Sequence, residues 1–125
     1  MSDSRALRSA LAQFEAVIAE MKEISRRSDS DRRGELVRLR RALSNQVMLV
    51  REAGATAFGN ATNDPLAREF RTRLSAVLSA IALHQANWPA VSIDEASDAF
   101  RESSANVAQV NASFVGWTRD ILARH

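Results

Sequence analysis

The chain has 125 residues; 46% of them are hydrophobic, 26% are charged, and the formal net charge is +2. This length and composition predict one folded, soluble domain, 1–125, whose core needs no metal or disulfide. The absence of cysteine excludes a disulfide scaffold, a cysteine-ligated zinc site and a thiol nucleophile. Because the first residues lead into an amphipathic pattern and not into an apolar leader, we expect a cytoplasmic protein.

The first predicted helix spans about 4–27, and its apolar side chains recur every three or four residues. The turn and capping residues of 28–31 end this helix and open a second one, which spans about 31–58. Gly54 lies on the inward stripe of the second helix, where glycine lowers helix stability, so we expect another helix to approach closely there. The inward stripes are Leu7, Leu11, Phe14, Ile18 and Met21 in the first helix and Leu36, Leu39, Leu43, Val47, Val50, Gly54 and Ala57 in the second.

The third predicted helix spans about 65–87. Asp64 followed by Pro65 indicates its start, because an N-cap acceptor precedes a proline whose missing N–H is not needed there. Pro89 ends the helix, since the residue before a proline is pushed out of helical geometry. Residues 74–93 contain no Lys, Arg, Asp or Glu. Polar residues interrupt this stretch, so we expect a buried helix and a loop and no membrane span.

The fourth predicted helix spans about 93–123, and Ser92 with Glu95 forms a capping box at its start. Its inward positions repeat in 3-4-3-4 spacing, which is typical of a helix packed nearly parallel to its neighbours. The stripe consists of Ile93, Ala96, Phe100, Ser103, Val107, Val110, Phe114, Trp117 and Ile121.

Four amphipathic helices joined by short loops predict an all-α fold, a single-domain, up-down-up-down four-helix bundle. No run of alternating apolar and polar residues favours a β-strand. The expected core consists of Leu11, Phe14, Ile18, Leu43, Val50, Leu74, Val77, Ile81, Phe100, Val107, Val110, Phe114 and Ile121.

Arginines cluster between residues 26 and 51, and a basic stripe of this kind suits phosphates, acidic lipid or an acidic protein. Nucleic-acid binding is not favoured, because no aromatic residues interleave the arginines and no nucleic-acid-binding motif is present. The alternative is a solvated helix face that pairs with glutamates of the first helix, Glu15, Glu20 and Glu23. The candidate anion-binding residues are Arg33, Arg38, Arg40, Arg41 and Arg51.

His84 lies on the inward stripe of the third predicted helix, one turn before Trp88. A histidine in a helical bundle serves as a phosphoacceptor, a metal or haem ligand, or a structural residue. A phosphoacceptor would have to be exposed, and the lysine that usually follows it in phosphotransfer bundles is missing here. Di-iron bundles need Glu-x-x-His pairs, and the sequence has none. The structural interpretation is favoured, and phosphotransfer through His84 stays open.

Residues 103–118 are also uncharged, although the outer face of an exposed helix normally carries Glu, Lys or Arg. Small uncharged side chains suit contact with another protein, because their desolvation costs little. We expect one of the two tryptophans to be mostly buried and the other partly exposed. The candidate protein-interface residues are Trp88, Asn106, Gln109, Asn111, Ser113 and Trp117.

The sequence therefore favours a non-catalytic bundle that binds another protein or a second copy of itself through its third and fourth helices, as a small adaptor, regulator or export chaperone. No nucleophile–base pair, phosphate loop or paired carboxylates are visible, so neither catalysis, a metal nor a cofactor is expected. The arginine-rich composition indicates a bacterial source. In its general organisation the chain resembles the short helical chaperones of bacterial flagellar and type III export, although no motif carries that likeness. Phosphotransfer through His84 and anion or nucleic-acid binding through the arginines are the alternatives.

Overall fold

The computed structural model describes residues 2–59, 63–90, 93 and 97–124, and it is 90% helical. Its four helices are α1 (Ser2–Arg26), α2 (Arg32–Phe58), α3 (Pro65–Asn87) and α4 (Ser97–Arg124). None of the described residues forms a strand. The expected all-α four-helix bundle is confirmed. The largest difference is at α4, which begins at Ser97 instead of near residue 93; the expected capping residues Ser92 and Glu95 lie outside the described residues.

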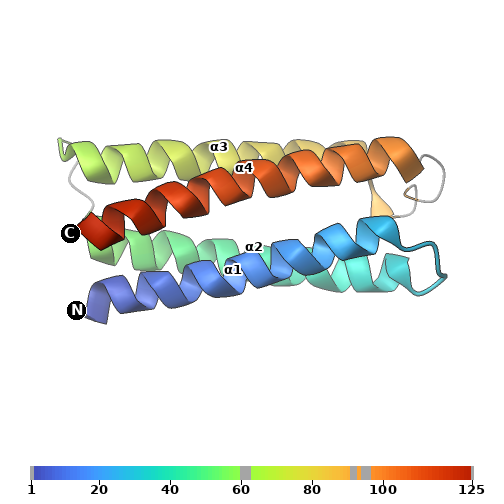
Figure 1. Ribbon diagram of the computed structural model, residues 1–125, viewed down its shortest axis with the longest axis horizontal. Helices are drawn as coiled ribbons and strands as arrows, with labels where there is room; N and C mark the ends of the chain where they lie inside the picture. The colour runs from blue at the N-terminus through green and yellow to red at the C-terminus, as the bar shows by residue number, and fades with distance from the viewer. Residues whose placement is uncertain (1, 60–62, 91–92, 94–96, 125) are drawn as a thin grey trace.

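The helices run antiparallel in sequence order, so α1 begins and α4 ends at the same end of the bundle (Figure 1). Each helix packs on two neighbours: α1 lies along α2 and α4, and α3 lies along α4 and α2. The α2–α3 pair packs least closely of these four. The connections from α1 to α2 and from α3 to α4 both lie at the opposite end (Figure 1).

Local sequence signals set the helix ends as expected. Asp64 caps α3 by accepting a hydrogen bond from the Leu66 N–H at 3.0 Å, and Pro65 is its first residue. Gly59 ends α2 with a positive φ of 85°, a conformation that glycine adopts without steric cost. Trp88 ends α3, and its N–H donates to the carbonyl oxygen of His84 at 2.9 Å.

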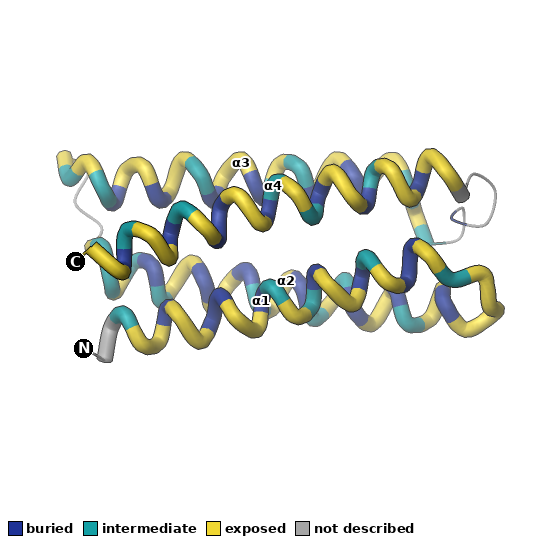
Figure 2. Tube along the Cα trace, in the orientation of Figure 1, coloured by how far each residue is buried: buried dark blue, intermediate teal, exposed yellow. Residues whose placement is uncertain are grey.

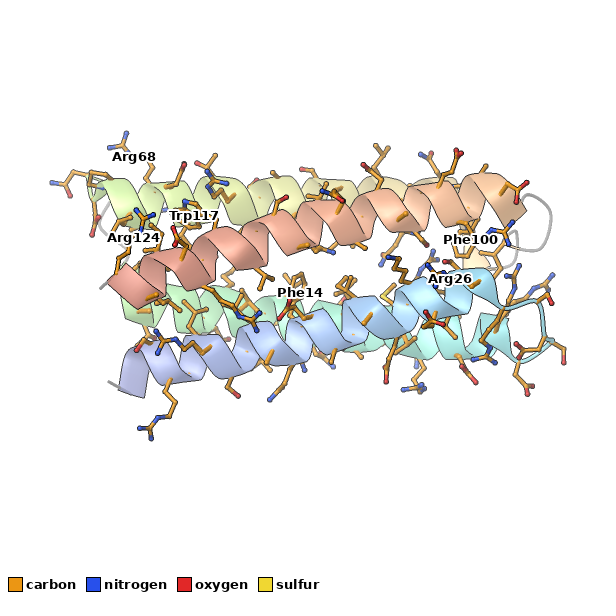
Figure 3. The ribbon with its side chains drawn as sticks, in the orientation of Figure 1. Phe14, Arg26, Arg68, Phe100, Trp117 and Arg124 are labelled. Atoms are coloured by element: carbon orange, nitrogen blue, oxygen red, sulfur yellow. The ribbon has the colours of Figure 1, made fainter. Side chains whose placement is uncertain are left out.

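The core runs the length of the bundle between the helices, as the dark blue inner stripes of Figure 2 show. Its centre is a row of aromatic rings: Phe58 packs on Phe70, Phe70 on Phe114, and Phe114 edge-to-face on Phe14, with centroids 5.1, 5.6 and 6.5 Å apart. Phe14 points between the helix layers in Figure 3, while Phe100 fills the end where the α3–α4 connection lies. Every expected core residue is buried except Val110 and Ile121.

Those two residues are half-buried because α4 turns a different edge to the core than its apolar spacing predicts. Phe100, Val107 and Phe114 are buried as expected. The other buried positions of α4, however, are three polar residues together with Val115 and Leu122, whereas the half-buried flank consists of Ser103, Val110, Trp117 and Ile121. The buried polar residues recur every seven positions, at Ser104, Asn111 and Thr118.

Gly54 makes room for an aromatic side chain of α3 and not for the close helix approach that its position on the stripe predicts, since α2 and α3 pack least closely of the four pairs. A Cβ added there would lie 2.2 Å from the Cε2 and Cζ atoms of Phe70, which is closer than atoms can pack. The missing side chain therefore lets the Phe70 ring of α3 rest against the backbone of α2.

Candidate functional site

The two uncharged stretches of the sequence lie side by side in α3 and α4. At one end the His84 and Ser103 side chains are in contact, with Nδ1 2.5 Å from Oγ. At the other end the guanidinium of Arg73 lies over the ring of Trp117, 4.7 Å from its centroid. Between these contacts, residues 74–83 of α3 run alongside residues 104–116 of α4, over a length of about 15–20 Å.

The outer surface of this stretch carries no charged side chain, and we call it the uncharged face. Leu83 is its largest apolar side chain and is 64% exposed. On α4 the face is bounded by Glu102 and Arg119. All its members are small, apolar or neutral polar and all are exposed: Ala76, Ser79 and Leu83 from α3, and Asn106, Gln109, Ser113 and Gly116 from α4.

Asn111, one of the candidate interface residues, does not belong to this face. It is 2% exposed, and its amide oxygen and nitrogen are buried without a hydrogen-bond partner. The expectation that it points outward is wrong, because the side of α4 that carries residues 104, 111 and 118 faces the core. Asn106, Gln109 and Ser113 are exposed as expected.

The two tryptophans lie at opposite ends of the α3–α4 pair, and both are half-buried. Trp88 packs on Phe100 with centroids 6.0 Å apart, and Trp117 packs under Arg73. The expectation that one tryptophan is mostly buried and the other partly exposed therefore stays a prediction. Each ring packs against the core and is only partly covered.

His84 lies in the core and not on the surface. It is 6% exposed, and its ring stacks on Phe100 with centroids 5.7 Å apart. Burial, with a smaller effect from the positive charge of Arg40, lowers the pKa of His84 from 6.5 to about 4. A phosphoacceptor needs an imidazole that another protein reaches through solvent, and the structure does not give His84 that position.

Two arginines of α2 hold the connection between α3 and α4. Arg40, which is half-buried, donates to the carbonyl oxygen of Trp88 at 2.7 Å, so its charge lies at the C-terminus of α3. Arg32 is 2% exposed and donates to the carbonyl oxygens of Ile93, at 3.0 Å, and of Arg27. Desolvation lowers the pKa of Arg40. Sequence reasoning missed Arg32, although it precedes Leu36 by one turn on the inward stripe.

The other candidate anion-binding residues, Arg33, Arg38, Arg41 and Arg51, are exposed but lie on different sides of α2. Arg38 lines a groove between α1 and α2 that also contains Glu20, Glu23 and Glu35. Arg51 faces the opposite neighbour, α3, where it lines a pocket. The five arginines therefore do not form one surface. Nor does the expected pairing with Glu15 occur, because Glu15 pairs with Arg119 of α4 at 2.6 Å.

Among the described residues, no group of three or more His, Cys, Asp or Glu side chains is placed to hold a metal ion. No described helix is long and apolar enough to cross a membrane. Comparison of the chain with protein-family models, with characterised proteins and with solved structures finds no match.

Proposed function

We propose that this chain is a non-catalytic helical bundle that binds another protein, or a second copy of itself, through the uncharged face of α3 and α4. The observation that carries the proposal is that the two uncharged stretches lie side by side. The His84–Ser103 contact marks one end of this shared surface, and the Arg73–Trp117 contact marks the other. A surface without charges loses little hydration when a partner covers it.

The exposed side chains support a protein as the partner. Leu83 provides one large apolar group that a partner would cover. Around it, alanine, serine and glycine let another backbone approach closely, while Asn106 and Gln109 offer amides for hydrogen bonds. This combination suits a helix of another protein laid across the uncharged face, as an adaptor, regulator or export chaperone would hold it.

The test places negative charges on the face without disturbing the core. Gln109→Glu with Ser113→Glu adds two carboxylates one turn apart, and both positions are exposed. The matched control is Ser9→Glu with Gln13→Glu, which makes the same exchanges at the same spacing on the exposed side of α1. Sedimentation over a range of concentrations measures self-association, and affinity capture from the native cell with mass spectrometry measures binding of other proteins.

We expect the α4 variant to lose the associated species, or the captured partner, while keeping the melting temperature of the wild type. The α1 control keeps both. The proposal is contradicted if two results are found together: the wild type stays monomeric at high concentration, and affinity capture finds no protein whose binding the α4 variant abolishes.

Two alternatives have less support. Phosphotransfer needs an exposed His84, and the imidazole is buried against Phe100. Nucleic-acid binding needs a continuous basic surface, and the arginines of α2 lie on different sides of the helix.

A further inference from the structure

A pocket of about 340 Å³ lies between α2 and α3, near the end of the bundle that holds the α2–α3 connection. It forms where these two helices pack least closely and where small residues leave space: Gly54, Ala55 and Gly59 from α2 and its cap, and Ala67 from α3. Its volume is within the range of about 300–1,000 Å³ that is typical of small-molecule sites.

The wall of the pocket is apolar. The ring of Phe70, which rests on Gly54, and the side chains of Leu74 and Leu78 line it on the α3 side. Phe70 and Leu74 belong to the buried core, so this wall is held in place by the packing of the whole bundle. An apolar ligand body that entered here would bury surface against a preformed wall, which is favourable at about 25 cal/mol per Å².

Two arginines, Arg51 of α2 and Arg71 of α3, also line the pocket, and no acidic side chain does. Neither arginine forms an ion pair or hydrogen bond with any of the described residues. The groove between α1 and α2 is different, because its arginines face three glutamates. The α2–α3 pocket thus combines an apolar wall with two positive charges and no acidic side chain in its lining.

We propose that the α2–α3 pocket binds a small carboxylate with an apolar tail, of the class of a medium-chain fatty acid. The tail lies against Phe70, Leu74 and Leu78, and the carboxylate accepts hydrogen bonds from Arg51 and Arg71. Guanidinium groups suit this role because their paired N–H donors match the two oxygens of a carboxylate.

The test uses decanoate below its micelle concentration as the probe, with decanol as the uncharged analogue. A titration of ¹⁵N-labelled protein follows the backbone amides, in which Gly54, Gly59 and Ser75 report on the pocket. We expect decanoate to shift these resonances with saturation and decanol to bind about tenfold more weakly, because it lacks the charge.

Variants separate the pocket from general attraction of anions to a basic protein. Arg51→Gln with Arg71→Gln should weaken decanoate binding by about tenfold. Arg38→Gln with Arg41→Gln removes the same net charge from exposed positions that do not line the pocket, and it should leave the affinity unchanged. Ser75→Leu narrows the pocket and should weaken binding, whereas Ser79→Leu, one turn further along α3, should not.

The proposal is wrong if decanoate leaves the pocket resonances in place, or if the two arginine double variants lose the same affinity. Equal binding of decanol and decanoate would overturn the assignment of a carboxylate. The inference does not depend on the proposed protein-binding function, because Gln109→Glu with Ser113→Glu lies on α4 and should leave decanoate binding unchanged.

Discussion

The imidazole of His84 and the hydroxyl of Ser103 join α3 to α4, with His84 Nδ1 2.5 Å from Ser103 Oγ. The same ring stacks on Phe100 and is almost fully buried. A histidine in this position is favoured in its neutral form, since protonation would place a charge in the core beside the guanidinium of Arg40.

We therefore expect the protein to lose stability in mild acid. The unfolded chain takes up a proton on His84 near pH 6.5, whereas the lowered pKa of about 4 keeps the folded form neutral. Neutral His84 therefore contributes fully to the free energy of unfolding above pH 6.5. As the pH falls from 6.5 towards 4, the free energy of unfolding decreases by about 3 kcal/mol. Urea melts across this range measure it. His84→Gln should remove this part of the slope, and an unchanged slope would show that His84 does not titrate as the burial predicts.

Truncating an aromatic ring of the central row should be costly. Phe14 and Phe114 are buried and pack edge-to-face, so Phe14→Ala or Phe114→Ala removes a large side chain from a rigid environment. We expect each change to lower the free energy of unfolding by about 3–5 kcal/mol in denaturant melts. Phe58→Ala, at a half-buried position, is the control and should cost less. A loss below about 1 kcal/mol at Phe14 would be inconsistent with the packing described.

Asn111 is a polar residue whose replacement should stabilise the fold. Both of its amide atoms are buried without a partner, so Asn111→Leu removes an uncompensated desolvation penalty of about 1–3 kcal/mol while keeping a similar size. The melting temperature should rise. Asn106→Leu makes the same exchange at an exposed position of α4 and should change stability by less than about 0.5 kcal/mol. If Asn111→Leu lowers the melting temperature instead, the amide has a partner in solution.

Two glycine-to-alanine changes should have opposite effects. Gly116 lies within α4, and nothing lies near the position that its Cβ would occupy, so Gly116→Ala should stabilise the protein by up to about 1 kcal/mol. At Gly54 the added methyl group overlaps the Phe70 ring, and the displacement of that ring should cost more than the helix gains, with a net loss of about 1–2 kcal/mol. Thermal melts of the two variants decide this, and stabilisation by Gly54→Ala would mean that the ring moves freely.

The fold was predictable because its signals are local. Asp64, Pro65 and Pro89 fix the ends of α3 through their own backbone chemistry, and the period of the apolar residues identifies the helices. The edge of α4 that enters the core was not predictable in this way. Val110 and Trp117 are more apolar than Asn111 and Thr118, yet Asn111 and Thr118 are the buried pair.

The reason is that burial on α4 depends on where its neighbours lie and not on hydrophobicity alone. Thr118 satisfies its hydroxyl within its own helix, through the carbonyl oxygen of Phe114 at 2.9 Å, so its burial needs no partner elsewhere. The bulkier Trp117 remains on the flank, where Arg73 covers its ring. The pocket was hidden from sequence for a related reason, since Arg51 and Arg71 come together only through the register of α2 against α3.

The bonds from Arg32 and Arg40 to the α3–α4 connection have a consequence for the order in which the bundle folds. Three of the four neighbouring pairs, α1–α2, α2–α3 and α3–α4, join helices that follow each other in sequence, as in fast-folding proteins, whereas α1–α4 joins the two ends of the chain. These two bonds span 61 and 48 residues, and they join partners that meet only after α3 has packed along the full length of α2. We therefore expect this end of the bundle to become ordered after the rate-limiting barrier. Replacing Arg32 by methionine should accelerate unfolding and leave the refolding rate nearly unchanged.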